Sequence, residues 1–230
     1  VVYKKLPKEL ISDVNSILEI DESDKVLGHE LFQGGDKEAY NMSTDIFVVD
    51  TPFLIEKLEE EAAKEEPRKL RYVLRDLAVA ENAFAYEYTG YLSNIHSVKA
   101  YFDANLDMLE SHKFYKLFAP NQKVYTKVKN EEPTYYAASS DVKLSQFASG
   151  SIVRGKVENS VISRNVDLSE GSSVSHSILF PRVKVAKGAT VEYAIVDKGV
   201  EIAEGVTIRG TENNPVVIKK GSVVTEDIVR

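Results

Sequence analysis

A repeat of 17 residues between residues 160 and 210 is the feature that most restricts how this chain can fold. Three successive blocks carry valine, isoleucine or leucine in the same columns, and glycine recurs at one position of each block. The columns are Val161, Ile178, Ile195; Val166, Val183, Val200; Leu168, Val185, Ile202; and Gly171, Gly188, Gly205. Self-similarity at a short fixed period is typical of a solenoid, in which each coil buries its inward side chains by stacking on its neighbours.

Each block predicts three strands and three corners per coil, because three short apolar clusters alternate with glycine, asparagine, serine or charged residues. A glycine in a fixed column indicates a corner with positive φ. A fourth copy is expected 16 residues after the third, because the corner before it is one residue short. Its members are Val216, Ile218, Gly221 and Val224. The alternative, an antiparallel sandwich, does not require the same residue type in every column.

The composition of the 230 residues is that of a globular chain with room for two domains. No apolar run approaches the ~18 residues of a membrane span. No signal peptide is visible and there are no cysteines, so a cytoplasmic location is the default expectation. A net charge of −7 argues against a nucleic-acid partner, which needs a basic patch. Since the chain begins at Val1 in the middle of a pattern, we expect a piece of a longer protein.

The first half of the chain alternates strand and helix signals, which predicts an α/β layer. Residues 17–27 fit strand, acidic turn and strand, and the apolar run 45–50 fits a strand buried on both faces of a parallel sheet. We expect helices after the N-cap Thr51, over residues 68–80, and over residues 97–109 with Ser97 as cap. The predicted domains are an α/β domain at 1–118, an extended linker at 119–140 and the solenoid at 141–230.

The repeat columns resemble the hexapeptide-repeat, left-handed parallel β-helix family. The left hand is implied only by this resemblance, because ordinary parallel crossovers are right-handed. Hexapeptide solenoids of acyltransferases use a histidine between coils as a base, and His176 lies in the corresponding half of this chain. The four histidines have neither metal-ligand spacing nor cysteine neighbours, so they predict no metal site.

Residues 90–108 resemble a motif of the glucose-1-phosphate adenylyltransferase (ADP-glucose pyrophosphorylase) family, W-x-D-V-G-T-x-x-A-Y-x-x-A-N-L-D. Ala100, Tyr101 and residues 104–107 match it directly, and Leu92 takes the place of the tryptophan. Together with the β-helix, the resemblance covers nearly the whole chain. It implies the C-terminal part of a nucleotidyltransferase Rossmann-like α/β domain followed by a left-handed β-helix, without the Gly-rich nucleotide loop that precedes these parts in the family.

The resemblance also implies degenerate substrate-binding positions. Asn94 stands where the family has its Mg²⁺-binding aspartate, and His96 and Ser97 replace a Gly-Thr pair. Upstream, Ser43 falls on a serine that contacts the sugar phosphate in the family, and Asp76 falls on an aspartate that binds glucose. No catalytic residue and no metal ligand is assigned to this chain, and Mg²⁺ is the cofactor expected for the family.

Two departures from the family pattern concern charge. Asn94 removes one negative charge from the metal shell, and residues 30–32 contain no lysine where the family has its sugar-phosphate lysine. Nucleotidyl transfer builds negative charge on phosphoryl and pyrophosphate groups, and it needs cations held by carboxylates and a lysine contact. The resemblance is therefore closest to the non-catalytic, D-type subunit of bacterial glycogen biosynthesis.

Three functions remain open from the sequence. The first is a regulatory or structural subunit that self-associates, binds a catalytic adenylyltransferase subunit, and could also bind a sugar phosphate. The second is an active nucleotidyltransferase that makes ADP-glucose and pyrophosphate from ATP and glucose 1-phosphate and tolerates Asn94. The third is a hexapeptide-repeat acyltransferase with a coenzyme A groove between coils and an essential His176.

Overall fold

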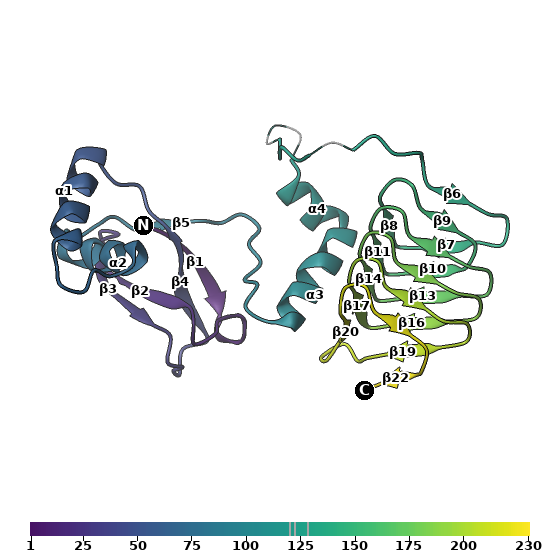
Figure 1. Cartoon of the computed structure of the whole chain (residues 1–230). Coiled ribbons are helices and arrows are strands. Elements are labelled where there is room, and N and C mark those ends of the chain that lie inside the picture. The colour runs from purple at the N-terminus through teal and green to yellow at the C-terminus, as the bar shows by residue number, and fades with distance from the viewer. Residues whose placement is uncertain (120, 122, 128) are drawn as a thin grey trace. The chain divides into compact units, whose positions relative to one another are not determined.

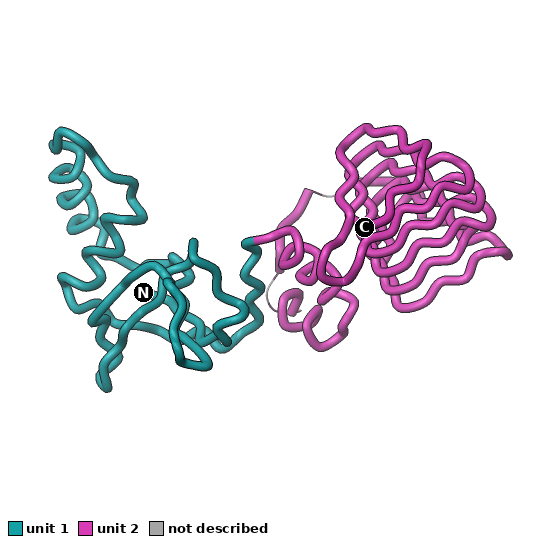
Figure 2. The backbone as a smooth tube through the Cα atoms, turned by 90° about the horizontal axis from the view of Figure 1, so that it is seen from below, with its two compact units in different colours: residues 1–96 teal, residues 97–230 magenta. Residues whose placement is uncertain are grey.

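The computed structural model describes residues 1–119, 121, 123–127 and 129–230. Pro120, Gln122 and Val128, which belong to the predicted linker, lie outside the described residues. The chain divides into two compact units, residues 1–96 and 97–230 (Figure 2). An α/β unit followed by a parallel β-helix is the predicted fold class, and it is confirmed (Figure 1).

Unit 1 is built on a sheet of five strands in the order β3-β2-β4-β1-β5. Its first four strands are antiparallel neighbours, and β5 runs parallel to β1. The strands are β1 (Val2–Pro7), β2 (Ser16–Ile20), β3 (Val26–Leu31), β4 (Ala39–Ile46) and β5 (Tyr86–Glu87), and a short 3-10 helix η1 (Lys8–Leu10) follows β1. The strand–turn–strand prediction for residues 17–27 is confirmed by the β2–β3 hairpin.

Two helices complete unit 1: α1 (Thr51–Ala62) and α2 (Leu70–Ala80). The N-cap of α1 is Asp50, whose carboxylate accepts a hydrogen bond from the backbone N–H of Phe53. The predicted cap, Thr51, is wrong by one residue, because the aspartate before it supplies the acceptor. Among the apolar residues of α2, Val73 and Ala78 are buried, whereas Leu70 is 48% exposed.

The predicted buried strand at residues 45–50 is wrong. Strand β4 ends at Ile46, and Val48 is 91% exposed. A short continuous apolar run carries no periodicity that distinguishes a buried strand from a loop. Asp45 also has φ +55, a left-handed conformation that a regular strand does not contain.

Helix α3 (Val98–Leu106) continues into the 3-10 helix η2 (Asp107–Leu109) and is followed by α4 (Ser111–Leu117). The predicted cap is confirmed, since Ser97 Oγ accepts a hydrogen bond from the N–H of Ala100 at 3.0 Å. These helices belong to unit 2, because Phe102, 1% exposed, packs in one cluster with Ile178 and Ile195 of the solenoid. The first compact unit therefore ends at residue 96, whereas the sequence analysis placed its first boundary at 118.

The solenoid consists of three parallel sheets, one on each side of the coil (Figure 1). The first contains β7 (Asp141–Lys143), β10 (Lys156–Glu158), β13 (Ser173–Ser175), β16 (Thr190–Glu192), β19 (Thr207–Arg209) and β22 (Ile228–Val229). The second contains β8 (Gln146–Phe147), β11 (Val161–Ile162), β14 (Ile178–Leu179), β17 (Ala194–Val196) and β20 (Val216–Ile218). The third contains β6 (Tyr135–Tyr136), β9 (Ile152–Val153), β12 (Asp167–Leu168), β15 (Lys184–Val185), β18 (Glu201–Ile202) and β21 (Val223–Val224).

The predicted columns are the observed register. Val161 pairs with Ile178 and Ile178 with Ile195, and the same 17-residue step joins Leu168, Val185 and Ile202. The recurring glycines have φ of +70, +69 and +73, which confirms the predicted left-handed corner. One detail differs. Ile178 and Ile195 pack against α3, while their neighbours Leu179 and Val196 fill the solenoid interior, because successive side chains of a strand point to opposite faces.

The predicted alignment of the fourth copy is wrong. Val216 pairs with Ala194 and Val224 pairs with Ile202, an offset of 22 residues instead of 16. The corner at residues 211–215 is therefore longer than its counterparts, not shorter, and it is held by a bridge between Thr211 and Asn214. An apolar pattern of about six residues recurs on every side of the coil, so an alignment shifted by one side matches nearly as well.

Candidate functional site

Ser43 lies in β4 and is 6% exposed. Its hydroxyl oxygen accepts a hydrogen bond from the backbone N–H of Asp45 at 3.3 Å. The hydroxyl therefore supports the bend at the end of β4, where the carboxylate of Asp45 is held by two arginines. Arg75, 6% exposed, donates to Asp45 from Nε and Nη2, and Arg71 Nη2 lies 3.5 Å from the same carboxylate.

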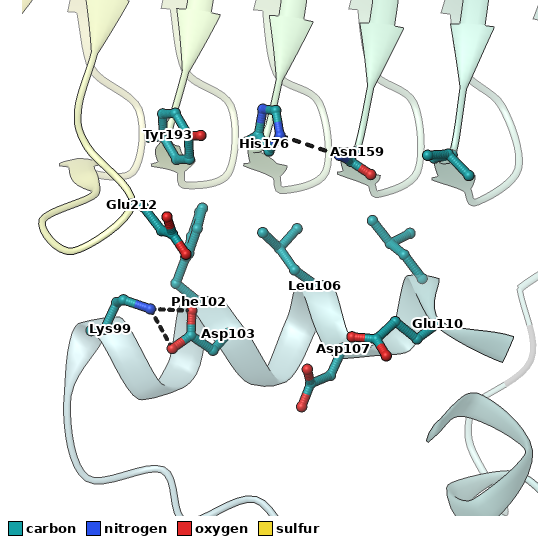
Figure 3. Close-up of a pocket in the computed structure, with 12 residues that line it drawn as sticks. Lys99, Phe102, Asp103, Leu106, Asp107, Glu110, Asn159, His176, Tyr193 and Glu212 are labelled. Atoms are coloured by element: carbon teal, nitrogen blue, oxygen red, sulfur yellow. Dashed lines mark hydrogen bonds and ion pairs between the residues drawn. The ribbon is translucent and has the colours of Figure 1, made fainter. Parts of the chain in front are cut away.

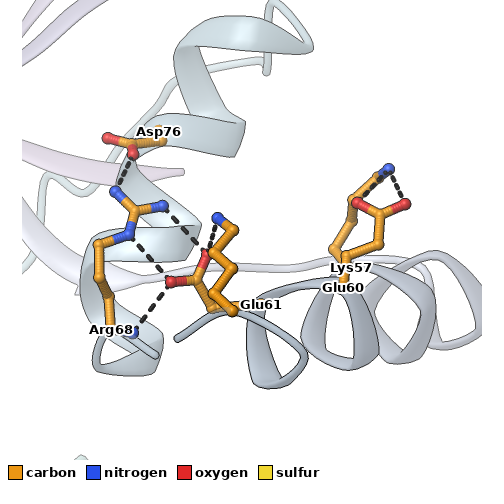
Figure 4. A network of polar contacts seen from close by, with 6 residues as sticks. Lys57, Glu60, Glu61, Arg68 and Asp76 are labelled. Atoms are coloured by element: carbon orange, nitrogen blue, oxygen red, sulfur yellow. Dashed lines mark hydrogen bonds and ion pairs between the residues drawn. The ribbon is translucent and has the colours of Figure 1, made fainter. Parts of the chain in front are cut away.

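Asp76 lies on α2 at the edge of a polar network (Figure 4). Its carboxylate accepts a hydrogen bond from Nη1 of Arg68. The same guanidinium donates to Glu61 of α1 from Nε at 3.0 Å and from Nη2 at 3.2 Å. Side-chain hydrogen bonds from Arg68 and then Lys64 lower the pKa of Glu61 to about 2. Asp76 thus takes part in joining α1 to α2.

Asn94 is committed to hydrogen bonds inside unit 1. Its Nδ2 donates to the carbonyl oxygen of Leu10 at 2.9 Å and to Oδ1 of Asn15 at 2.8 Å. In return, Nδ2 of Asn15 lies 3.4 Å from Oδ1 of Asn94. This amide pair ties the loop before α3 to the segment after η1, which gives the asparagine a structural reason to be there.

The three predicted positions do not form one cluster by direct contact. No hydrogen bond or ion pair recorded for Ser43, Asp76 and Asn94 joins any two of them. Within the described ranges there is also no group of three or more His, Cys, Asp or Glu side chains that could hold a metal ion. In nucleotide sites Mg²⁺ is usually held by one or two carboxylates together with substrate phosphates and waters, and position 94 offers an amide in place of such a carboxylate.

His29 is a half-buried polar group that the sequence does not mark as a functional candidate. Its Nε2 lies 3.1 Å from the hydroxyl of Ser16, its ring stacks on Phe47, and its buried Nδ1 has no hydrogen-bond partner among the described residues. Burial and the nearby positive charge of Arg75 lower the pKa of His29 to about 4, although Asp45 acts in the opposite direction. The imidazole is therefore neutral at physiological pH.

A groove of about 660 Å³ lies within unit 2, between the α3–η2 segment and one corner of the solenoid (Figure 3). We call it the helix–corner groove. Its solenoid wall is a column of corner residues from successive coils, and its helical wall carries Phe102 and Leu106. The column consists of Leu144, Asn159, His176 and Tyr193, all with φ between +43 and +47. Gln146 Nε2 donates to the carbonyl oxygen of Met108 at 2.5 Å, which fixes one end of the helical wall to the solenoid.

The polar groups of the groove come from the helical segment at residues 99–110, from the corner column and from the corner at residues 211–215. His176 stacks on Tyr193 with ring centroids 4.8 Å apart, and Nδ2 of Asn159 lies 3.2 Å from its Nε2. The longer corner at residues 211–215 contributes Glu212. Among these groups, only His176 is a functional candidate from the sequence. The repeat in the column was the available signal for Tyr193, because it occupies the same corner position one coil later.

In the described part of the chain no helix is long and apolar enough to cross a membrane. Comparison with known proteins adds relatives for both units. Residues 129–229 match the family model described as GlmU-like, C-terminal hexapeptide. The chain is 34% identical over 197 residues to the glycogen biosynthesis protein GlgD of Bacillus subtilis (strain 168), covering 86% of this chain and 55% of the relative.

Two further relatives cover less of the chain. Identity is 53% over 127 residues with the glycogen biosynthesis protein GlgD of Geobacillus stearothermophilus, covering 55% of this chain and 37% of that protein. It is 30% over 150 residues with the glucose-1-phosphate adenylyltransferase of Clostridium acetobutylicum, covering 64% and 39%. The chain thus spans about half the length, or less, of the curated relatives it matches. The resemblance found in the sequence motifs is confirmed.

Proposed function

Because this chain is a relative of the glycogen biosynthesis protein GlgD and of the glucose-1-phosphate adenylyltransferases, we propose that it serves glycogen synthesis as a regulatory or structural subunit. In this role it associates with a catalytic adenylyltransferase subunit and changes that subunit's activity. The proposal concerns the whole protein, of which this chain carries an α/β part and the β-helix.

The observation that supports the proposal most directly is the hydrogen bonding of the Asn94 side chain. By the motif resemblance, Asn94 replaces the family's metal-binding aspartate, and its amide N–H groups donate to the carbonyl oxygen of Leu10 and to Oδ1 of Asn15. At the place of the sugar-phosphate lysine, Leu31 is exposed and Phe32 is buried against Tyr40. Without a carboxylate for the metal and a cation for the phosphate, the developing charge of nucleotidyl transfer has no compensation here.

The test is reconstitution with the catalytic adenylyltransferase of the same organism. Size-exclusion chromatography with light scattering should show a hetero-oligomer, and ADP-glucose formation by the mixture should differ from that of the catalytic subunit alone in rate or in effector response. The heat-denatured chain serves as the control for non-specific effects. The absence of a complex, together with unchanged kinetics, would refute the proposal.

The second candidate is an active nucleotidyltransferase, and it is favoured by the retention of Ser43 and Asp76. The full-length protein alone should then form ADP-glucose from ATP and glucose 1-phosphate, and Asn94→Asp should raise the rate only modestly. A change from no turnover to robust turnover in Asn94→Asp would instead indicate that the native protein is inactive. The acyltransferase alternative has less support, because Nδ1 of His176 is buried and Nε2 faces Asn159.

A further inference from the structure

We propose that the helix–corner groove is a binding site for an organic cation, a ligand that carries a guanidinium or alkylammonium group. The site lies wholly within unit 2 and shares no residue with Ser43, Asp76 or Asn94. It is therefore independent of the nucleotidyltransferase positions and of the proposed association with a catalytic subunit.

The dimensions and walls of the groove suit a small organic ligand. A volume of about 660 Å³ lies within the ~300–1,000 Å³ range of small-molecule sites. One wall offers the half-buried side chain of Leu106 next to the buried ring of Phe102, and the other offers the stacked rings of His176 and Tyr193 (Figure 3). A ligand there would contact apolar and aromatic surface on two sides and polar groups at the ends.

The charges around the groove select the sign of the ligand. Four carboxylates and one ammonium group line it: Asp103, Asp107, Glu110, Glu212 and Lys99. Lys99 pairs with Asp103 at 2.6 Å, and Lys113, which is outside the lining, pairs with Asp107 at 2.6 Å and with Glu110 at 2.7 Å. Negative charge exceeds positive charge even when both lysines are counted. A phosphate-bearing ligand would be repelled, and a cation would be attracted.

Glu212 is the carboxylate available to such a cation. Among the described residues no hydrogen bond or ion pair of its side chain is recorded, whereas Asp103, Asp107 and Glu110 each have a lysine partner. In the close-up Glu212 lies toward the same end of the groove as Phe102 and Tyr193 (Figure 3). A cation at that end could therefore contact a carboxylate and an aromatic ring together, and cations over the face of a tyrosine are attracted by its ring electrons.

The corner that carries Glu212 is held by its own backbone. Thr211 and Asn214 exchange backbone hydrogen bonds at 3.2 and 3.1 Å, and Gly210 N–H donates to the carbonyl oxygen of Glu192 at 2.9 Å. A Cβ atom at Gly210 would approach the carbonyl oxygen of Tyr193 to 2.5 Å, so the corner is packed closely on the coil below. The backbone that carries the Glu212 carboxylate is thus ordered before a ligand binds, and less conformational entropy is lost on binding.

The test is calorimetric titration of the chain with spermidine and with agmatine, at two salt concentrations. Wild type should bind one molecule with saturation. Glu212→Gln should weaken binding about tenfold, the size of one hydrogen bond to a charged group. The control is Glu204→Gln, which removes an exposed carboxylate outside the groove and should leave affinity within about twofold of wild type. Equal weakening by both variants would reveal non-specific attraction to a chain of net charge −7 and overturn the proposal.

A second readout locates the ligand. The imidazole resonances of the four histidines can be assigned with His176→Asn, a substitution that suits the left-handed conformation at this corner. Saturating spermidine or agmatine should shift the His176 resonance and leave those of His29 and His96, which lie in unit 1, unchanged. A shift produced only by an arginine-rich peptide would assign the cation to a partner polypeptide. No saturable binding of any of the three probes would refute the site.

Discussion

The carboxylate of Asp45 accepts a hydrogen bond on each of its two oxygens from Nη2 of Arg75, at 3.0 Å in both cases. The guanidinium is nearly inaccessible to solvent, while Asp45 has φ +55 just before β4 ends. The pair therefore connects the strained end of β4 to α2. It also gives the positive charge of a buried arginine its partner.

We expect Asp45→Ala to lower the free energy of unfolding by about 1–3 kcal/mol, because it leaves the Arg75 guanidinium buried and unpaired. Asp45→Asn should cost less, since asparagine tolerates positive φ and retains one acceptor oxygen. Urea denaturation followed by circular dichroism measures both. Asp36→Ala is the control, an exposed aspartate in the loop before β4. A loss no larger than that of the control would show that the pair contributes little.

Asn94→Asp should destabilise unit 1 by about 1–3 kcal/mol, because a carboxylate replaces the donor that faces the carbonyl of Leu10 and Oδ1 of Asn15. It should not create a Mg²⁺ site, since the described residues contain no group of three or more His, Cys, Asp or Glu side chains that could hold a metal ion. The melting temperatures of wild type and Asn94→Asp without Mg²⁺ measure the loss of stability. The same measurements at about 10 mM Mg²⁺ show whether the variant binds the ion, because a ligand of the folded state raises the melting temperature. A melting temperature raised by Mg²⁺ in Asn94→Asp alone would contradict the structural role.

The lowered pKa of His29 leads us to expect that the free energy of unfolding depends on pH. Its folded pKa of about 4 lies below the ordinary value of 6.5, so between these values the unfolded chain binds more protons. The contribution of His29 is therefore complete above pH 6.5 and is lost as the pH falls toward 4. We expect about 1–2 kcal/mol, since the ring is only partly shielded from water. Denaturation midpoints from pH 4 to 7 should show this slope in wild type, and His29→Gln should show a flatter curve.

Alanine substitutions at two glycines of the solenoid distinguish the cost of backbone strain from the cost of a steric clash. Gly188 has φ +69 and open space where a Cβ would lie, so Gly188→Ala should cost about 1–2 kcal/mol from the left-handed conformation alone. Gly210 has no such φ, but its Cβ would meet backbone atoms of Tyr193 and Val216 at 2.5 and 2.7 Å. Gly210→Ala should cost more, about 3 kcal/mol, as an overpacked site. Guanidinium denaturation should rank them in this order, and the reverse order would place the strain elsewhere.

The solenoid was predictable because its side chains obey one rule in every coil. The pairing of Val161 with Ile178 follows directly from the 17-residue step, and the corner glycines follow from the left-handed backbone. The longer corner at residues 211–215 was not predictable, since a hexapeptide pattern matches itself after a shift by one side. The apolar face of α3 was visible, but the sequence does not specify that Phe102 packs on Ile178.

The contacts of the candidate sites depend on residues far apart in the chain. Asn94 and Asn15 are separated by 79 positions, and no periodic pattern links an amide in a loop to another amide. No periodic pattern links Glu212 to α3 either. They line the same groove because the fold of the solenoid places the corner at residues 211–215 near this helix. Motif resemblance identified Asn94 as a substitution, and the fold supplies the reason why an amide is favoured there.

The corner at residues 211–215 adds five residues to the 17-residue step, yet β20 and β21 recover their register on the preceding coil. Stacking in this solenoid thus tolerates five additional residues in the chain that leaves one side and re-enters the next. A foreign peptide spliced between Glu212 and Asn213 would be displayed on a rigid support while the ladders on either side stay paired. The β-helix is in this sense a ready carrier for grafted epitopes.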